Sequence, residues 1–197
     1  MAIEIRQATR ERSRELTDVL GRAFATDPLL MWPMKPGSGP AEACRFFALF
    51  DGEVVDDGWL WEAGEAAGVA LWVPPDGGDR YIEVDDSIMR VAMREEFSDD
   101  EGARYEAMWD WISEHMPEEP HWFLDHVGVD PDQQGRGIGG ALVRLGLEWS
   151  RHDGVPAFLE TANPVNVPLY EHFGFRVVED ADAPREGPHI WFMRFNP

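Results

Sequence analysis

Four glycines lie within six residues, from Gly135 to Gly140, between an apolar run and an amphipathic segment. Successive glycines let backbone N–H groups turn towards one point, and the start of a helix adds a partial positive charge there. Each glycine weakens a helix start by roughly 0.5–1 kcal/mol relative to alanine, so a turn without a ligand gains nothing from them. The pattern therefore predicts an anion site, most often one for phosphate.

The spacing of these glycines distinguishes between classes of phosphate site. A Walker loop requires Lys-Ser or Lys-Thr after its last glycine, whereas Gly139 is followed by Gly140 and Ala141. A dinucleotide fingerprint requires G-x-G-x-x-G in a strand–helix–strand unit early in a parallel sheet, and the spacing here is different. The pattern that fits is Q-x-x-G-x-G, with Gln134, Gly137 and Gly139.

This pattern, after a strand that ends V-x-V-x-P, resembles the loop of the GNAT superfamily of acyl-CoA-dependent N-acyltransferases. A second motif, N-x-x-x-Y-x-x-x-G-F, carries the same resemblance at Asn166, Tyr170, Gly174 and Phe175. Over Trp122 to Phe195 the chain is also similar to puromycin N-acetyltransferases, in the stretches WFL, VGVDPDQQGRGIG, VPAFLETANP and EGPHIWFM. The N-terminal part matches only loosely, so the resemblance transfers cofactor and reaction better than substrate.

The resemblance implies an α/β (α+β) GNAT fold with acetyl-CoA as co-substrate. In that fold the central sheet is mixed and mostly antiparallel, helices flank it, and coenzyme A lies where two central strands splay apart. The backbone N–H of Val127 or Val129 faces the thioester, and Tyr170 is the usual general acid for the departing thiolate. The implied cofactor-binding residues are Val127, Gly128, Val129, Gln134, Gly135, Arg136, Gly137, Ile138, Gly139, Gly140, Asn166 and Tyr170.

The acceptor amine must lose a proton, so a base or a relay to water is also required. Alternation along the predicted strand 122–129 places Asp125 on one face and His126 on the other. Asp125 falls on the face where related enzymes carry acidic or histidine bases, and Glu160 on the next strand is a second candidate. Asp125 can instead bind the acceptor's ammonium, and Glu160 can pair with a backbone group or an arginine. No tight spacing of metal ligands is evident, so no metal is expected.

The composition of the chain limits its partners. A net charge of −21, from 17 basic and 38 acidic residues, argues against nucleic acid and anionic membranes and favours a cationic acceptor, although acidity also serves solubility. The 197 residues suit one domain, 1–197, and 44% are hydrophobic. No apolar run reaches the ~18 residues of a membrane span. The single cysteine, Cys44, allows no internal disulfide and favours a cytoplasmic location.

The elements that must position these residues follow from periodicity and turn residues. Expected helices cover 9–24, 43–50 and a short segment from about 168 to 173, which ends at Gly174. Expected strands cover 3–5, 53–61, 68–73, 122–129, 155–161, 175–178 and 189–195. Residues 81–119 are expected to form an insert of two acidic helices that are separated near Ser98. Its Met and Trp side chains suit a lid over an apolar cationic ligand, or simply packing on the sheet.

The leading interpretation is an acetyl-CoA-dependent N-acetyltransferase for a small cationic amine. An aminonucleoside antibiotic such as puromycin is one candidate acceptor, which would make the protein a resistance enzyme. The alternatives are transfer to a protein or peptide N-terminus or to a polyamine, and a non-catalytic acyl-CoA-binding domain. Tyr170 argues against the last of these. The sequence leaves open whether the protein forms a homodimer.

Overall fold

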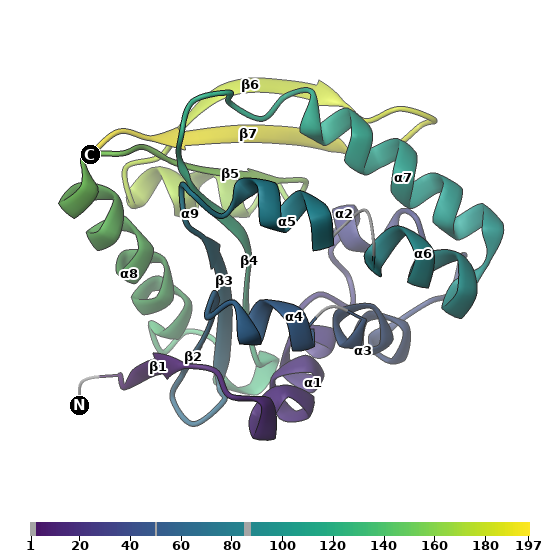
Figure 1. Ribbon diagram of the computed structural model, residues 1–197, viewed down its shortest axis with the longest axis horizontal. Coiled ribbons are helices and arrows are strands. Elements are labelled where there is room, and N and C mark those ends of the chain that lie inside the picture. The colour runs from purple at the N-terminus through teal and green to yellow at the C-terminus, as the bar shows by residue number, and fades with distance from the viewer. Residues whose placement is uncertain (1–2, 50, 85–87) are drawn as a thin grey trace.

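The computed structural model describes residues 3–49, 51–84 and 88–197 (Figure 1). Seven strands of the described residues form one sheet in the order β1-β2-β3-β4-β5-β7-β6. Neighbouring strands are antiparallel except for β4 and β5, which are parallel, so the predicted mixed and mostly antiparallel sheet is confirmed. The strands are β1 Ile5–Gln7, β2 Leu60–Ala63, β3 Gly68–Val73, β4 Trp122–Val129, β5 Ala157–Thr161, β6 Arg176–Asp182 and β7 His189–Phe195.

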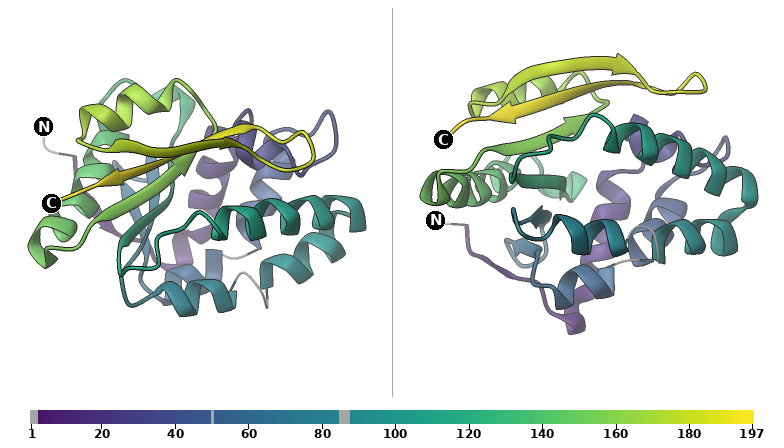
Figure 2. Two further views of the ribbon diagram at one scale, coloured as in Figure 1. Left: turned by 90° about the horizontal axis from the view of Figure 1, so that it is seen from above. Right: turned by 45° about the horizontal axis from the view of Figure 1, so that its top comes forward.

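Helices cover both faces of the sheet (Figures 1 and 2). One apolar core contains buried residues of α1, α3 and α7, and a second contains those of α8 and α9. The helices are α1 Ser13–Ala23, α2 Pro28–Met31, α3 Pro40–Ala48, α4 Asp51–Asp56, α5 Gly78–Val84, α6 Arg90–Ala92, α7 Asp99–Ser113, α8 Ile138–Asp153 and α9 Asn166–His172, with a π-helical segment at Met93–Phe97.

The two central strands, β4 and β5, pair only at their first residues. The register joins Trp122 to Ala157 and Phe123 to Phe158, and no pair follows it. Beyond Phe123 the two strands separate, as the GNAT resemblance implies. The opening between them is where the candidate site lies.

Helix α8 is held tightly against the sheet below this opening. A Cβ placed on Gly146 would lie 2.1 Å from Cε2 of Trp72, so only glycine lets the helix approach β3 this closely. The Trp72 indole N–H donates to the Leu142 carbonyl at 3.1 Å. The position of α8 fixes the glycine-rich loop that leads into it.

The predicted strand 53–61 is wrong before Leu60. Residues Asp51–Asp56 form helix α4, and β2 begins only at Leu60. Val54 and Val55 are both buried, and two consecutive buried side chains do not fit a strand with one face exposed. Gly58, at φ +76°, then turns the chain into the strand, a conformation that glycine adopts without strain.

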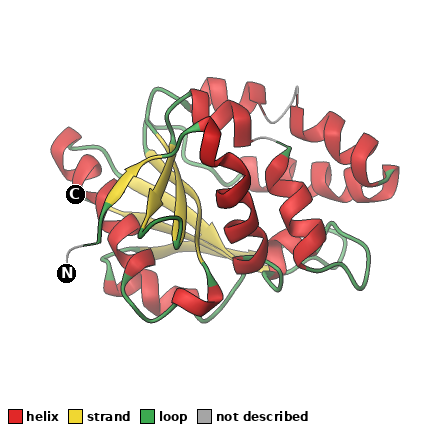
Figure 3. Cartoon of the chain, turned by 90° about the horizontal axis from the view of Figure 1, so that it is seen from below, coloured by secondary structure: helices red, strands yellow, loops and turns green. Residues whose placement is uncertain are grey.

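The described residues of the insert include three helical stretches, α5, 90–97 and α7, where two helices were expected. Residues 85–87, between the first and the second of these, lie outside the described part of the chain. The expected break near Ser98 is confirmed, because its hydroxyl accepts a hydrogen bond from the Glu101 N–H at the start of α7. Many of the helices gather to one side of the sheet (Figure 3).

Candidate active site

A continuous cleft runs from the glycine-rich loop to the gap between β4 and β5. Its outer part, the loop cavity, has a volume of about 420 Å³ and includes the glycine-rich loop and α9. Its inner part, the central cleft, has a volume of about 390 Å³ and lies between β4, β5 and the end of α1. Both parts share Val127, Val129, Gln134, Asn166 and Tyr170.

The glycine-rich loop has the conformation and the space that an anion requires. Gly135 and Gly137 adopt φ values of +75° and +81°, and a Cβ on either would meet no atom within 4 Å. These glycines are therefore needed for their backbone conformation, because no neighbour crowds them. Gly137 caps the first turn of α8, which directs the helix N-terminus towards the loop cavity. The loop thus fits a pyrophosphate held by backbone N–H groups.

Two of the residues implied at the cofactor differ from the others in their placement. Ile138, the first residue of α8, is buried in the core but also lines the loop cavity. Arg136 is exposed and lies outside the residues that line the loop cavity and the central cleft. The other implied residues line one or both of these cavities. They are Val127, Gly128, Val129, Gln134, Gly135, Gly137, Gly139, Gly140, Asn166 and Tyr170.

Helix α9 brings Tyr170 and Asn166 to the junction between the loop cavity and the central cleft. The Asn166 amide donates to the Thr161 hydroxyl at 3.3 Å, which ties the start of α9 to the end of β5. Burial raises the pKa of the Tyr170 phenol above its ordinary value, and Asp27 and Glu160 raise it further. The hydroxyl is therefore protonated at neutral pH and can donate a proton.

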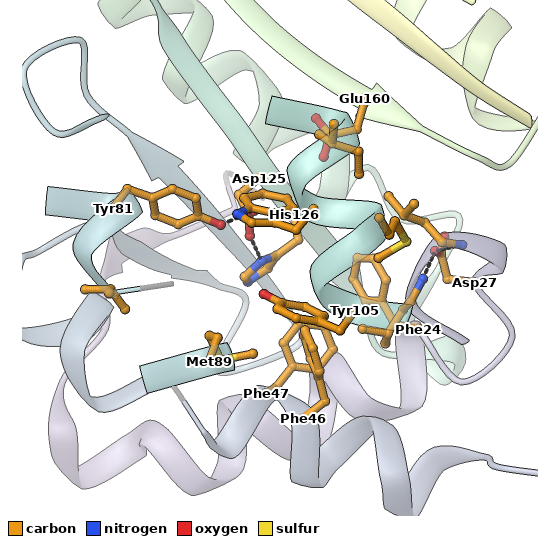
Figure 4. Close-up of a pocket in the computed structure, with 16 residues that line it drawn as sticks. Phe24, Asp27, Phe46, Phe47, Tyr81, Met89, Tyr105, Asp125, His126 and Glu160 are labelled. Carbon is orange, nitrogen blue, oxygen red and sulfur yellow. Dashed lines mark hydrogen bonds and ion pairs between the residues drawn. The ribbon is translucent and has the colours of Figure 1, made fainter. Parts of the chain in front are cut away.

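The inner end of the cleft opens into an apolar cavity of about 100 Å³, here called the acceptor cavity (Figure 4). Apolar side chains from α2, α3, the insert and the end of α1 supply most of its wall, and half of the lining residues are Phe, Tyr, Trp or Met. Six residues line both the acceptor cavity and the central cleft, namely Phe24, Asp27, Leu29, Asp125, His126 and Glu160. The insert therefore closes the end of the cleft that lies opposite the glycine-rich loop.

The expected alternation of faces along β4 is wrong at Asp125. Leu71 pairs with His126, and the next residue of β3, Trp72, pairs with Leu124, so Asp125 has no partner in this register. One residue inserted in this way is a β-bulge, which turns the following side chains to the opposite face. Asp125 and His126 consequently both line the acceptor cavity. His126, which alternation placed on the opposite face, belongs to the site.

Three carboxylates surround the junction of the acceptor cavity and the central cleft. Glu160 Oε2 is buried and has no hydrogen-bond partner among the described residues. Burial, with a contribution from the Asp125 charge, raises the Glu160 pKa well above its ordinary value. Burial also raises the pKa of Asp27, whose Oδ1 caps α2 by accepting from the N–H groups of Leu29 and Leu30. Such a group of acids favours a bound cation.

Sequence patterns did not identify Asp27, Tyr81 or His126 as site residues. Asp27-Pro28 indicated only the end of a helix, although Asp before Pro is also a typical start of the next one. Tyr81 lies in α5, and its hydroxyl donates to Asp125 Oδ1, a contact that no local pattern indicates. Within the described ranges there is no group of three or more potential metal ligands. Nor does any helix described there have the length and apolar character of a membrane span.

Sequence comparison finds relatives among acetyltransferases. Residues 22–175 match the model of the acetyltransferase (GNAT) family. An uncharacterised N-acetyltransferase of Schizosaccharomyces pombe is 28% identical over 133 residues, which are 60% of this chain and 51% of that protein. A mycothiol acetyltransferase of Corynebacterium glutamicum is 39% identical over 72 residues, which are 35% of this chain and 24% of that protein. The matched part thus spans about half of the first relative and a quarter of the second.

Solved structures share the fold along the whole chain. A Corynebacterium glutamicum structure named histone acetyltransferase HPA2 and related acetyltransferase has a TM-score of 0.71 at 26% identity and covers 100% of this chain and 97% of its own. Arylalkylamine N-acetyltransferase 2 of Aedes aegypti has a TM-score of 0.64 at 15% identity, with 100% and 99% covered. Because the family model matches most of the chain and the observed fold agrees with it, this protein belongs to the acetyltransferase (GNAT) family.

Proposed function

We propose that this protein transfers the acetyl group of acetyl-CoA to the amine of a small cationic acceptor with an apolar substituent. One observation carries the proposal. A single cleft joins a glycine-rich anion loop at one end to a carboxylate-ringed apolar cavity at the other. Acetyltransferases of this family use acetyl-CoA as co-substrate, and the cleft offers each reactant the chemistry that it needs.

Coenzyme A would bind along the outer part of the cleft. The N–H groups from Gln134 to Gly140 would hold its pyrophosphate, and Asn166 would lie beside it. When bound, acetyl-CoA supplies an acetyl group activated as a thioester. The backbone N–H of Val127 or Val129, near the end of β4, would donate to the thioester carbonyl oxygen as it gains negative charge. The buried Tyr170 hydroxyl holds the proton that the sulfur needs.

The acceptor would bind at the inner end. A protonated amine at the mouth of the acceptor cavity would meet Asp27, Asp125 and Glu160. It would also give the buried Oε2 of Glu160 a hydrogen-bond donor, which this atom lacks among the described residues. Either Asp125 or Glu160 is placed to bind the ammonium or to take its proton. The apolar wall would receive the rest of the acceptor. The cavity of about 100 Å³ is smaller than the roughly 150 Å³ that holds a benzene molecule, so short substituents fit without movement of the insert.

Two finer proposals rest on the sequence alone. The similarity of the C-terminal part to puromycin N-acetyltransferases makes puromycin a compound to test, and with it a role in antibiotic resistance. The single cysteine supports a cytoplasmic location, because the chain can form no internal disulfide.

The test is turnover of acetyl-CoA with a panel of amines, followed by release of free thiol. The panel contains short alkylamines, arylalkylamines, polyamines, puromycin and a peptide with a free N-terminus. We expect turnover with small cationic amines and little with the peptide. Binding of acetyl-CoA without thiol release for any amine would favour the non-catalytic acyl-CoA-binding alternative. A preference for the peptide would overturn the proposed acceptor class.

A further inference from the structure

The bulge in β4 brings an acid and a base into contact inside the acceptor cavity. His126 Nδ1 lies 2.5 Å from Asp125 Oδ2, and the other oxygen of Asp125 accepts the Tyr81 hydroxyl (Figure 4). Side chains that follow each other along a regular strand point to opposite faces, so this contact exists only because of the bulge. The three side chains form a chain of hydrogen bonds from the insert to the central sheet.

This geometry favours the tautomer of His126 in which Nδ1 carries the proton. An ionised carboxylate only accepts hydrogen bonds, so the short contact requires a proton on Nδ1. The lone pair of the neutral ring is then on Nε2. His126 is 7% exposed and lines both the acceptor cavity and the central cleft, and its ring packs edge-to-face with those of Phe24 and Phe47. A histidine oriented in this way can act as a base.

Tyr81 is held in place independently of Asp125. Its ring centroid lies 6.0 Å from that of Phe123, 6.1 Å from that of Trp109 and 6.4 Å from that of Trp59. These rings come from β4, from α7 and from the loop before β2. The aromatic packing fixes the direction of the hydroxyl, so the insert can control the orientation of Asp125.

We propose that His126 takes the proton of the acceptor's ammonium, and that Tyr81 and Asp125 are positioning residues that hold it in the required tautomer. This proposal rests on the proposed function. An N–H bond of the ammonium breaks, an Nε2–H bond forms on His126, and the amine keeps the electron pair with which it attacks. The proton then passes to water at the cleft. The titratable groups that line the acceptor cavity or the central cleft together with His126 are Asp27 before α2, Tyr81 in α5, Tyr105 in α7, Asp125 in β4, Glu160 in β5 and Tyr170 in α9.

The proposal assigns a different role to each of the nearby acids. Both oxygens of Asp125 already accept hydrogen bonds, so it serves better as an orienting group than as the base. Glu160 Oε2 has no partner in the described residues and is placed to bind the ammonium itself. His126 then removes the proton from a cation that the acids hold in position.

The pH dependence of kcat/KM tests this arrangement, with the intact enzyme and its best amine from the panel. Tyr81→Phe removes the hydrogen bond that Asp125 accepts from the Tyr81 hydroxyl. The Asp125 carboxylate then attracts the protonated His126 ring more strongly and stabilises it. The acidic limb of the kcat/KM profile should therefore move to higher pH by roughly 0.5–1 unit, a shift that corresponds to the free energy of about one hydrogen bond. Asp125→Asn removes the negative charge and the tautomer control. The limb should move to lower pH, and kcat should fall by about 10²–10⁴.

Two further variants complete the test. In the Asp125→Asn background, Tyr81→Phe should no longer move the limb, because Tyr81 acts only through Asp125. His126→Gln should remove the limb and lower kcat by about 10²–10⁴, with acetyl-CoA affinity retained as a sign of an intact fold. Retention of the limb in His126→Gln together with its loss in Glu160→Gln would identify Glu160 as the base and overturn the proposal. Shifts of equal sign in the first two variants would also overturn it. Absence of turnover in the wild-type protein would instead reject the proposed function.

Discussion

Phe123 of β4 and Phe158 of β5 form the last register pair between the two central strands. Continued by two residues, the same register would place Asp125 directly opposite Glu160. Like charges at opposing positions destabilise a sheet. Instead, β4 bulges at Asp125 and the strands separate, so both acids line one cavity. The two carboxylates that would repel each other in a closed sheet thus both face the open cleft.

The first prediction concerns the stability cost of Glu160. Its pKa is raised in the folded protein by burial and by Asp125, so between the unfolded and the folded pKa the folded state binds more protons. Stability therefore falls as pH rises through this window. Glu160→Gln removes the penalty, and thermal unfolding should show a higher Tm than wild type at pH 8. Each kcal/mol gained corresponds to roughly 2–4 °C in a chain of this size.

Two controls accompany this measurement. Near pH 4 the Tm difference should shrink, because Glu160 is then largely protonated in both states. The exposed Glu171→Gln removes the same charge from the surface of α9 and should give no comparable gain at pH 8. A Tm for Glu160→Gln at or below that of wild type at pH 8 would contradict the prediction that the buried Glu160 carboxylate destabilises the folded protein.

The second prediction tests the glycine-rich loop. Gly137→Asp places a negative charge at a left-handed position where a phosphate is expected, and calorimetry should show at least a tenfold loss of acetyl-CoA affinity. Gly137→Asn is the matched control, since asparagine has the same shape, carries no charge and tolerates this conformation. The affinity of Gly137→Asn for acetyl-CoA should fall less than that of Gly137→Asp. Equal affinity for wild type and Gly137→Asp, with the fold intact, would place coenzyme A elsewhere.

The third prediction concerns the proton held by Tyr170. Tyr170→Phe removes one oxygen and little volume, so kcat should fall by roughly 10²–10⁴ while acetyl-CoA affinity changes little. The loss is confined to the transition state because the ground-state packing of the ring stays the same. Steady-state kinetics and calorimetry measure the two effects. Turnover within threefold of wild type would remove Tyr170 from the mechanism.

The fourth prediction tests the acceptor cavity. Val84 is 1% exposed and lines this cavity, so Val84→Phe should fill part of its about 100 Å³. The KM for amines with larger substituents should rise at least tenfold, while the KM for acetyl-CoA stays near that of wild type. Ile82→Phe is the control, because Ile82 lies in the same helix and is 57% exposed. Similar kinetics for both variants would mean that the acceptor binds outside this cavity.

The sequence predicted correctly those elements that depend on local rules. The strand Trp122–Val129 has the predicted bounds, Gly174 adopts φ +100° at the end of α9, and the insert breaks at Ser98. Periodicity failed at α4, where buried neighbouring valines resemble a strand. Local patterns cannot separate a short helix from a strand when one side of the segment packs against another helix.

The sequence by itself determined the glycine-rich loop, because glycine spacing acts through backbone conformation within a few residues of the chain. It also determined most of the strands and the two motifs that carry the family resemblance. Only the tertiary structure decided what lies at the other end of the cleft. Asp27, Tyr81, the neighbours Asp125 and His126, and Glu160 come from four separate places in the chain. A bulge, a strand separation and the packing of the insert bring them together, and all three depend on contacts between residues far apart in the sequence.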